Sequence, residues 1–357
     1  MIIIYLFIIG IGLFLIIIFL YLLTRFRKFE LIKEIKNKKT LWLIVVILFL
    51  SFFVSIYFLG LTVIVYLIHL ALFFILGDIV FLISKKHIKY NIIGLMVIII
   101  TTGYITYAYF NAHNIKETKY VIESEKIDNE INIIQIADVH LGTTIDSDDF
   151  NKHINEISLI NPDVLVLTGD VVDESTSYED MIKACNSLGK VKTKYGVYIA
   201  FGNHDLNTYG GNRNYTSEQF LNELRKNGVI TLEDEIVLIN EEFYLIGRRD
   251  KTVNNRLKIS QLINDIDKDK LIIVLDHQPV DFKNNVKSGV DLVLSGHTHG
   301  GQMFPLGYIG ELVSDNEMTY GLEKTGKTNF IVSSGMSGWG IPLKTGTISE
   351  YVHITIK

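Results

Sequence analysis

Two histidines stand two positions apart in residues 295–302, which read SGHTHGGQ. The apolar run 290–294 precedes them, so a strand is expected to end in a glycine-rich turn. The glycines of this turn allow positive φ and a close approach of the backbone to an ion or an anion. The spacing therefore predicts a turn that aims two imidazole ligands at a shared point.

Polar residues follow four other apolar runs in the same way. The runs end near residues 137, 167, 201 and 275, and the loops after them carry Asp138 and His140, Asp170 and Asp173, Asn203 to Asp205, and Asp276 and His277. A single strand-end carboxylate is an ordinary turn residue. Five such loops in one domain indicate a common site, because open α/β sheets bind ligands beyond the carboxyl ends of their strands.

The donors in these loops indicate the kind of ion. Oxygen and imidazole nitrogen without thiolate suit manganese, iron, zinc or magnesium, and they disfavour a structural zinc knot. The candidate ligands are too many for one ion: Asp138, His140, Asp170, Asn203, His277, His297 and His299. Two ions that share a bridging carboxylate are the economical arrangement, and such a pair can clamp both the attacking and the leaving oxygen of a displacement.

The five motifs, taken in order, resemble those of the calcineurin-like metallophosphoesterases over roughly residues 131–357. The motifs are Asp138-x-His140, Gly169-Asp170-x-x-Asp173, Gly202-Asn203-His204-Asp205, His277 and Gly296-His297-x-His299. The resemblance implies a two-sheet αββα sandwich that hydrolyses phosphate mono- or diesters by attack of a metal-bridging hydroxide, with manganese the favoured ion. The extension 300–302 resembles the membrane-associated bacterial branch, which includes predicted phosphodiesterases and relatives of UDP-diacylglucosamine hydrolase.

The resemblance also implies a role for each matching residue. Asp170 would bridge two ions, the first completed by Asp138, His140 and His299, and the second by Asn203, His277 and His297. His204 would protonate the leaving oxygen or steady the phosphoryl group, with Asp205 orienting its imidazole. Two further residues are substrate-binding candidates by position: Arg248, which follows a predicted strand and has a guanidinium suited to phosphate, and Gln302.

The chain from residue 131 onward alternates between strand and helix patterns, which is the signature of an α/β domain. Helices are expected over 149–160, 179–188, 217–227 and 259–266. Strands are expected over 131–136, 164–167, 197–201, 243–246, 271–275, 292–294, 330–333 and 351–356.

The first 110 residues read as an all-α membrane domain of four transmembrane helices, over about 2–23, 41–59, 61–83 and 92–110. Basic residues concentrate in the loops after the first and third of these segments, so both loops are expected in the cytoplasm. A multi-pass protein of the cell membrane then has its domain 131–357 outside the cytoplasm, after a polar linker 111–130.

Charge and cysteine content limit the possible partners and cross-links. A net charge of −5 without a basic stripe makes nucleic acid a poor partner, and the single Cys185 excludes an internal disulfide. The sequence does not indicate an oligomeric state. The expected partner is a phosphoester substrate, and the short tether favours a lipid-linked or cell-envelope one. The alternative is a non-catalytic metal- or nucleotide-binding membrane sensor or transport-associated protein, but such a binder has no use for the leaving-group acid His204.

Overall fold

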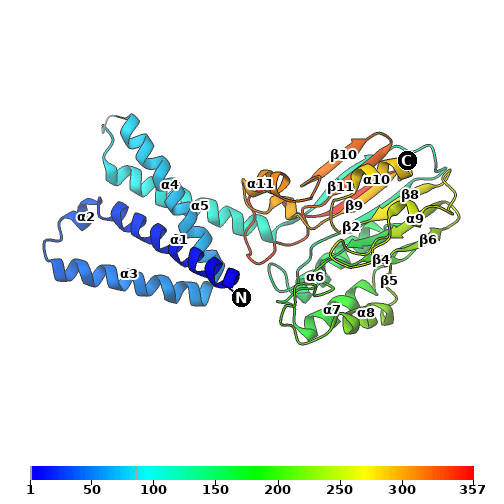
Figure 1. The fold of residues 1–357 in the computed structure, drawn as a ribbon, viewed down its shortest axis with the longest axis horizontal. Coiled ribbons are helices and arrows are strands. Elements are labelled where there is room, and N and C mark those ends of the chain that lie inside the picture. The colour runs from blue at the N-terminus through cyan, green and yellow to red at the C-terminus, as the bar shows by residue number, and fades with distance from the viewer. Residues whose placement is uncertain (1, 85–86) are drawn as a thin grey trace. The chain divides into compact units, whose positions relative to one another are not determined.

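The computed structural model describes residues 2–84 and 87–357. The chain divides into two compact units, Met1–Ala108 and Tyr109–Lys357 (Figure 1). Lys85 and Lys86, which support the predicted topology, lie outside the described residues.

The first unit is helical. Its helices are α1 (Ile2–Phe26), α2 (Glu30–Lys33), α3 (Lys38–Leu59), α4 (Leu61–Ile83) and most of α5 (Tyr90–His113), whose last turn belongs to the second unit. Helices lie over the four segments expected from the sequence, and Gly60, with a φ of 57°, separates α3 from α4. Apolar side chains of α1, α4 and α5, among them Leu22, Phe74 and Val97, pack together.

Two of these helices are candidate membrane spans by length and composition. Among the described residues, α4 and α5 are long and apolar enough to cross a bilayer, while Gly12–Phe26 is a shorter apolar stretch. Asp78 in α4 is paired with Arg25 and Lys28, at 3.1 Å and 3.4 Å, so this acidic group already has cationic partners within the unit.

The second unit contains two six-stranded mixed sheets. Sheet A has the order β1-β12-β2-β3-β4-β5, in which only the β12–β2 pair is antiparallel. Sheet B has the order β10-β11-β9-β8-β7-β6, with antiparallel pairs at both edges. The strands of sheet A are β1 (Ile115–Ile122), β2 (Ile131–Ile136), β3 (Val164–Thr168), β4 (Val197–Ala200), β5 (Ile230–Thr231) and β12 (Ser349–Ile356). Those of sheet B are β6 (Glu235–Ile239), β7 (Phe243–Gly247), β8 (Leu271–Leu275), β9 (Leu292–Ser295), β10 (Gly321–Thr325) and β11 (Thr328–Val332).

Helices cover the outer faces of both sheets. Sheet A carries α6 (Ser147–Ile160), α7 (Tyr178–Leu188) and α8 (Ser217–Lys226), and sheet B carries α9 (Ile259–Leu262) and α10 (Phe282–Ser288). Alternate strand residues divide between the layers, since Ile133 faces the other sheet and Ile134 faces the helices of sheet A. Figure 1 shows α6, α7 and α8 together on one side of the sheets. The expected αββα layering is therefore present.

The predicted linker 111–130 differs from the structure. Helix continues to His113, and 115–122 form the edge strand β1, which pairs in parallel with β12. Charged residues occur on both faces of this strand, as at Lys116 and Lys119, so the sequence shows no apolar alternation there. Charge is a common property of edge strands. The strands β5, β6 and β10 and the helices α2, α10 and α11 (Leu306–Val313) were also not predicted, and α9 is shorter than expected.

Candidate metal centre

The predicted ligands all lie on turns at the carboxyl ends of strands of both sheets. Five of them adopt positive φ, which is uncommon for residues other than glycine: Asp138, His140, Asp170, His297 and His299, between 40° and 72°. Such conformations cost about 1–3 kcal/mol each and persist where the surroundings fix them. The turns are therefore held by the fold in shapes that extended or helical backbone could not provide.

Glycines let the turns approach one another. A Cβ on Gly296 would lie 2.4 Å from Asp138 Oδ2, and one on Gly202 would lie 2.1 Å from Asp170 Oδ1. Gly300 and Gly301 have the positive φ predicted for this turn, whereas Gly296 is required for its small size.

Two groups of ligand atoms converge. Asp138, His140 and His299 form one group, and Asp170, His277 and His297 form the other, with the ligand atoms of each group within 4.8 Å of one another. Asp170 Oδ2 lies 3.0 Å from His277 Nε2 and 3.7 Å from His140 Nε2, so one carboxylate oxygen faces both groups.

Each of three imidazoles is oriented through its Nδ1 atom. Nδ1 of His140 lies 2.9 Å from Asp173 Oδ2, Nδ1 of His277 lies 2.7 Å from the Thr168 carbonyl, and Nδ1 of His299 lies 3.1 Å from the Ser337 carbonyl. These acceptors require Nδ1 to carry the proton, which leaves the Nε2 lone pair facing the centre, the arrangement of metal-ligating histidines.

The residues present fit a pair of cations. Nε2 of His140, Nε2 of His277 and Oδ1 of Asn203 are buried and have no hydrogen-bond partner, which is costly unless another group satisfies them. Burial raises the pKa of Asp138 to about 6, and the nearby Asp170 carboxylate contributes to this increase. Burial lowers the pKa of His297 to about 4, which favours the neutral imidazole that a metal requires.

Asp205 does not orient His204, so that prediction is wrong. Its fully buried carboxylate accepts four backbone N–H bonds of 2.7–3.1 Å, from Asp170, Val171, Val172 and Gly202. The carboxylate therefore ties the turn after β3 to the turn after β4 and fixes the backbone that carries Asp170.

Glu174 takes the place predicted for Asp205. Both of its carboxylate oxygens lie 3.2 Å from His204 Nδ1. The backbone N–H of His204 donates to Asp170 Oδ1 at 2.8 Å, so the histidine is attached directly to the centre. Glu174 immediately follows Asp173 in the same turn, but no spacing rule pairs it with His204, and sequence reasoning missed it.

A hollow of about 560 Å³ opens over the ligands. Its lining combines ligand residues with two aromatic side chains, Tyr209 and Trp339, whose rings lie 5.9 Å and 5.6 Å from the His204 ring between centroids. Tyr209 belongs to the polar loop that follows Asp205, whereas Trp339 is far away in the sequence and was not predicted.

Arg248 is not available to a substrate, contrary to the prediction. It is buried, and Nη1 lies 3.2 Å from Asp276 and 3.1 Å from Asp281, while Nη2 donates to the Leu257 carbonyl. Arg248 was predicted to bind phosphate because its guanidinium follows a strand. In the tertiary structure, carboxylates of the protein already occupy that guanidinium.

Gln302 is likewise fully engaged by the protein. The two hydrogens of its Nε2 face the carbonyls of Trp339, Ile341 and Leu343, which lie at 3.1–3.2 Å, and its Oε1 accepts from the Trp339 N–H at 2.9 Å. The predicted direct substrate contact is therefore wrong. Gln302 instead fixes the loop that presents Trp339 to the hollow.

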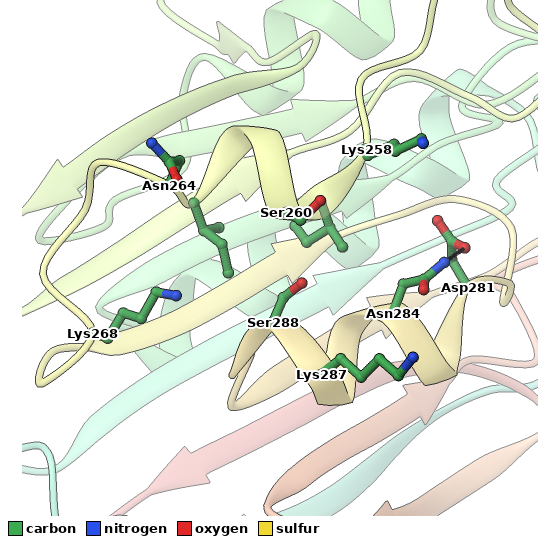
Figure 2. A pocket seen from close by; sticks show the side chains of 10 residues that line it. Lys258, Ser260, Asn264, Lys268, Asp281, Asn284, Lys287 and Ser288 are labelled. Atoms are coloured by element: carbon green, nitrogen blue, oxygen red, sulfur yellow. Dashed lines mark hydrogen bonds between the residues drawn. The ribbon is translucent and has the colours of Figure 1, made fainter.

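A slightly larger hollow, of about 630 Å³, lies between α9 and α10 (Figure 2). Its rim carries Lys258, Lys268 and Lys287, which are exposed, and its acidic member Asp281 is already bonded to Asn284 and Arg248. None of the metal-ligand groups found in the described part of the chain lies here. The candidate metal ligands therefore line the smaller hollow and not this one.

Comparison with known proteins agrees with this location. The family model described as calcineurin-like phosphoesterase matches residues 131–301. An uncharacterized metallophosphoesterase of Campylobacter jejuni is 30% identical over 292 residues, covering 77% of this chain and 74% of that protein. An uncharacterized metallophosphoesterase of Aquifex aeolicus is 32% identical over 260 residues, which cover 70% of this chain and 95% of that protein. A transmembrane protein with metallophosphoesterase domain of Danio rerio is 28% identical over 283 residues, covering 73% and 62%.

Proposed function

Because this chain belongs to the calcineurin-like phosphoesterase family and is a metal-dependent phosphoesterase, we propose that it is a membrane-anchored enzyme that cleaves phosphate mono- or diesters at a two-ion centre. One observation carries the two-ion proposal: a single oxygen of Asp170 faces both groups of ligand atoms.

The ions would divide the ligands as follows. Asp138, His140 and His299 would hold the first, His277, His297 and Asn203 would hold the second, and Asp170 would be shared. We propose manganese, with iron, zinc or magnesium as the other ions that suit oxygen and imidazole donors. Two bound ions would supply a nucleophile at neutral pH and neutralise charge on the phosphate oxygens.

His204 is the residue proposed to protonate the leaving oxygen or to steady the phosphoryl group. It lines the hollow, and its Nδ1 is engaged by Glu174, so Nε2 is the atom turned toward a substrate. Glu174 acts through His204 and is a positioning residue. The hydrogen bond from the His204 backbone to Asp170 fixes the distance between this imidazole and the proposed bridging ligand.

The substrate proposed is a phosphoester attached to a lipid or to another cell-envelope component. Tyr209 and Trp339 provide an apolar rim on one side of the ligands, where the uncharged part of such a substrate could pack. The phosphate itself would meet the ions and His204, since Arg248 is occupied by carboxylates.

The protein is proposed to lie in the cell membrane, with four crossings and the phosphoesterase domain outside the cytoplasm. Candidate spans α4 and α5 and the many exposed apolar side chains of the helical unit support anchoring. A reporter fused after Lys357 tests orientation: alkaline phosphatase should be active there and a fluorescent protein dark. The opposite pattern would contradict the orientation derived from loop charges.

Turnover tests the enzymatic proposal. The purified full-length protein with manganese should hydrolyse bis(p-nitrophenyl) phosphate, and Asp170→Ala should abolish this activity. His204→Ala should reduce kcat by about 10²–10⁴-fold, the usual contribution of a positioned acid, while the bound metal content stays unchanged. A wild-type protein that binds metal without turnover of any mono- or diester would favour the non-catalytic sensor instead.

A further inference from the structure

Helix α11 carries large apolar side chains to the surface. It follows the His299 turn directly, and none of its residues is buried. Leu312 is 84% exposed, Val313 78% and Tyr308 70%, and Phe304 just before the helix is also exposed. Contiguous exposed apolar residues of this kind mark an interaction surface.

The position of α11 within the second unit indicates what covers it. Thr347 lines a cavity of about 260 Å³ together with Phe304 and Tyr308. The carbonyls of Thr347 and Lys344 accept bonds of 2.7 Å and 3.0 Å from Asn111 Nδ2. One loop, 344–347, therefore contacts both α11 and the last turn of the candidate membrane span α5.

A second contact fixes the same turn of α5. Ser349 Oγ donates to the Ala112 carbonyl at 2.8 Å, so the end of the helix is held to the domain by backbone and side chain alike. Tyr109 and Phe110 in this turn are exposed. Exposed aromatic residues thus occur both at the end of the span and on α11, and such residues favour the boundary between lipid and water.

We propose that Phe304, Tyr308, Leu312 and Val313 enter the membrane interface, so that α11 is a second, peripheral attachment of the phosphoesterase domain. The proposed occupant of this face is a bilayer, because the candidate membrane span α5 joins the domain beside α11. Glu311 is the single charged residue of the helix, so attachment depends on apolar burial rather than on charge.

This attachment would orient the metal centre. Gly301 packs directly on Gly307, because a Cβ on Gly301 would lie 2.2 Å from Gly307 Cα. The turn that carries His297 and His299 is therefore continuous with the start of α11, and the proposed membrane contact would hold the centre at a fixed depth above the lipid. The inference rests on the proposed anchoring, not on the proposed catalysis.

Fluorescent probes on single cysteines in the full chain test the inference. Leu312→Cys carries the probe on α11. Leu159→Cys is the matched control, because Leu159 is 87% exposed at the far end of α6. Ile99→Cys in α5 reports anchoring. The native Cys185 is fully buried and burial raises its pKa, so it should not be labelled.

The labelled proteins are reconstituted in phosphatidylcholine vesicles that contain nitroxide-labelled lipid, and aqueous iodide is added in parallel samples. Nitroxide lipid should quench the Leu312 probe at least about threefold more than the Leu159 probe, with the reverse order for iodide, since an interfacial side chain contacts lipid rather than bulk water. Val313→Cys should repeat the Leu312 result.

Three outcomes would overturn the inference. Equal iodide quenching of the Leu312 and Leu159 probes would mean that α11 stays in water. A Leu312 probe that neither quencher reaches would mean that protein covers the face. If nitroxide lipid fails to quench the Ile99 probe, the anchoring itself is wrong, and the α11 attachment falls with it. Phosphodiester turnover measured on the same samples reports the proposed catalysis separately.

Discussion

Asp205→Asn separates a structural role of Asp205 from a catalytic one. The carboxylate accepts two N–H bonds at each oxygen, whereas the amide of asparagine has only one oxygen. Two buried donors then face an NH₂ group instead of an acceptor. At about 1–3 kcal/mol for each unsatisfied buried donor, the turns after β3 and β4 should lose about 2–6 kcal/mol of stability.

Native-state hydrogen exchange measures this loss where it occurs. The amides of Asp170, Val171, Val172 and Gly202 should exchange at least about 30-fold faster, because about 2 kcal/mol corresponds to that factor. Manganese affinity should fall as well, since the backbone that carries Asp170 is loosened.

His204→Ala is the matched control. It removes the adjacent side chain, whose polar contact is with Glu174, and should leave exchange at those four amides unchanged while turnover falls. The reasoning is refuted if Asp205→Asn keeps wild-type exchange and metal affinity but loses turnover, because Asp205 would then act on the chemistry and not on the backbone.

Three further predictions follow from buried or rim side chains. Arg248→Met should lower the free energy of unfolding by about 1–3 kcal/mol without changing KM, because it removes one of the two guanidinium partners of the buried Asp276 while Arg256 remains paired with it; a raised KM in the folded variant would restore a substrate role. Burial lowers the pKa of Lys344 from 10.5 in the unfolded chain to about 7, so the unfolded state binds more protons between these values and stability should rise with pH across that window. In denaturant titrations at several pH values, Lys344→Met should remove this rise of stability with pH. An unchanged rise would mean that other groups cause it. Trp339→Ala should raise KM for bulky phosphodiesters several-fold with little change in stability, whereas unchanged kinetics would exclude the rim from binding.

The candidate metal-ligand residues could be identified from the sequence because each one lies next to a strand end. A continuous apolar run ends at a polar residue, and this pattern occupies only about ten residues of sequence. Five such patterns in order indicated the α/β class, the family and the convergence of their polar residues. The structure brings together Asp138 with His299 and Asp170 with His277, and in each pair the two residues follow strands of different sheets.

The contacts around these residues were less predictable. Asp205 and Arg248 each satisfied a sequence rule, but each has partners from distant segments that determine its role. Glu174 and Trp339 reach His204 through loops whose paths depend on how the two sheets pack. Edge strand β1 was not predicted because charged residues on both of its faces interrupt the apolar alternation.

The sequence by itself determined which residues could hold ions and the order in which strands and helices follow one another, because these depend on side-chain type and local periodicity. Only the tertiary structure decided which donors satisfy each buried polar atom. Asp205 stabilises turns instead of orienting His204, and Gln302 holds a loop instead of a substrate. A hydrogen bond requires an angle and a distance of about 3 Å, and these are set by the packing of segments that may lie a hundred residues apart.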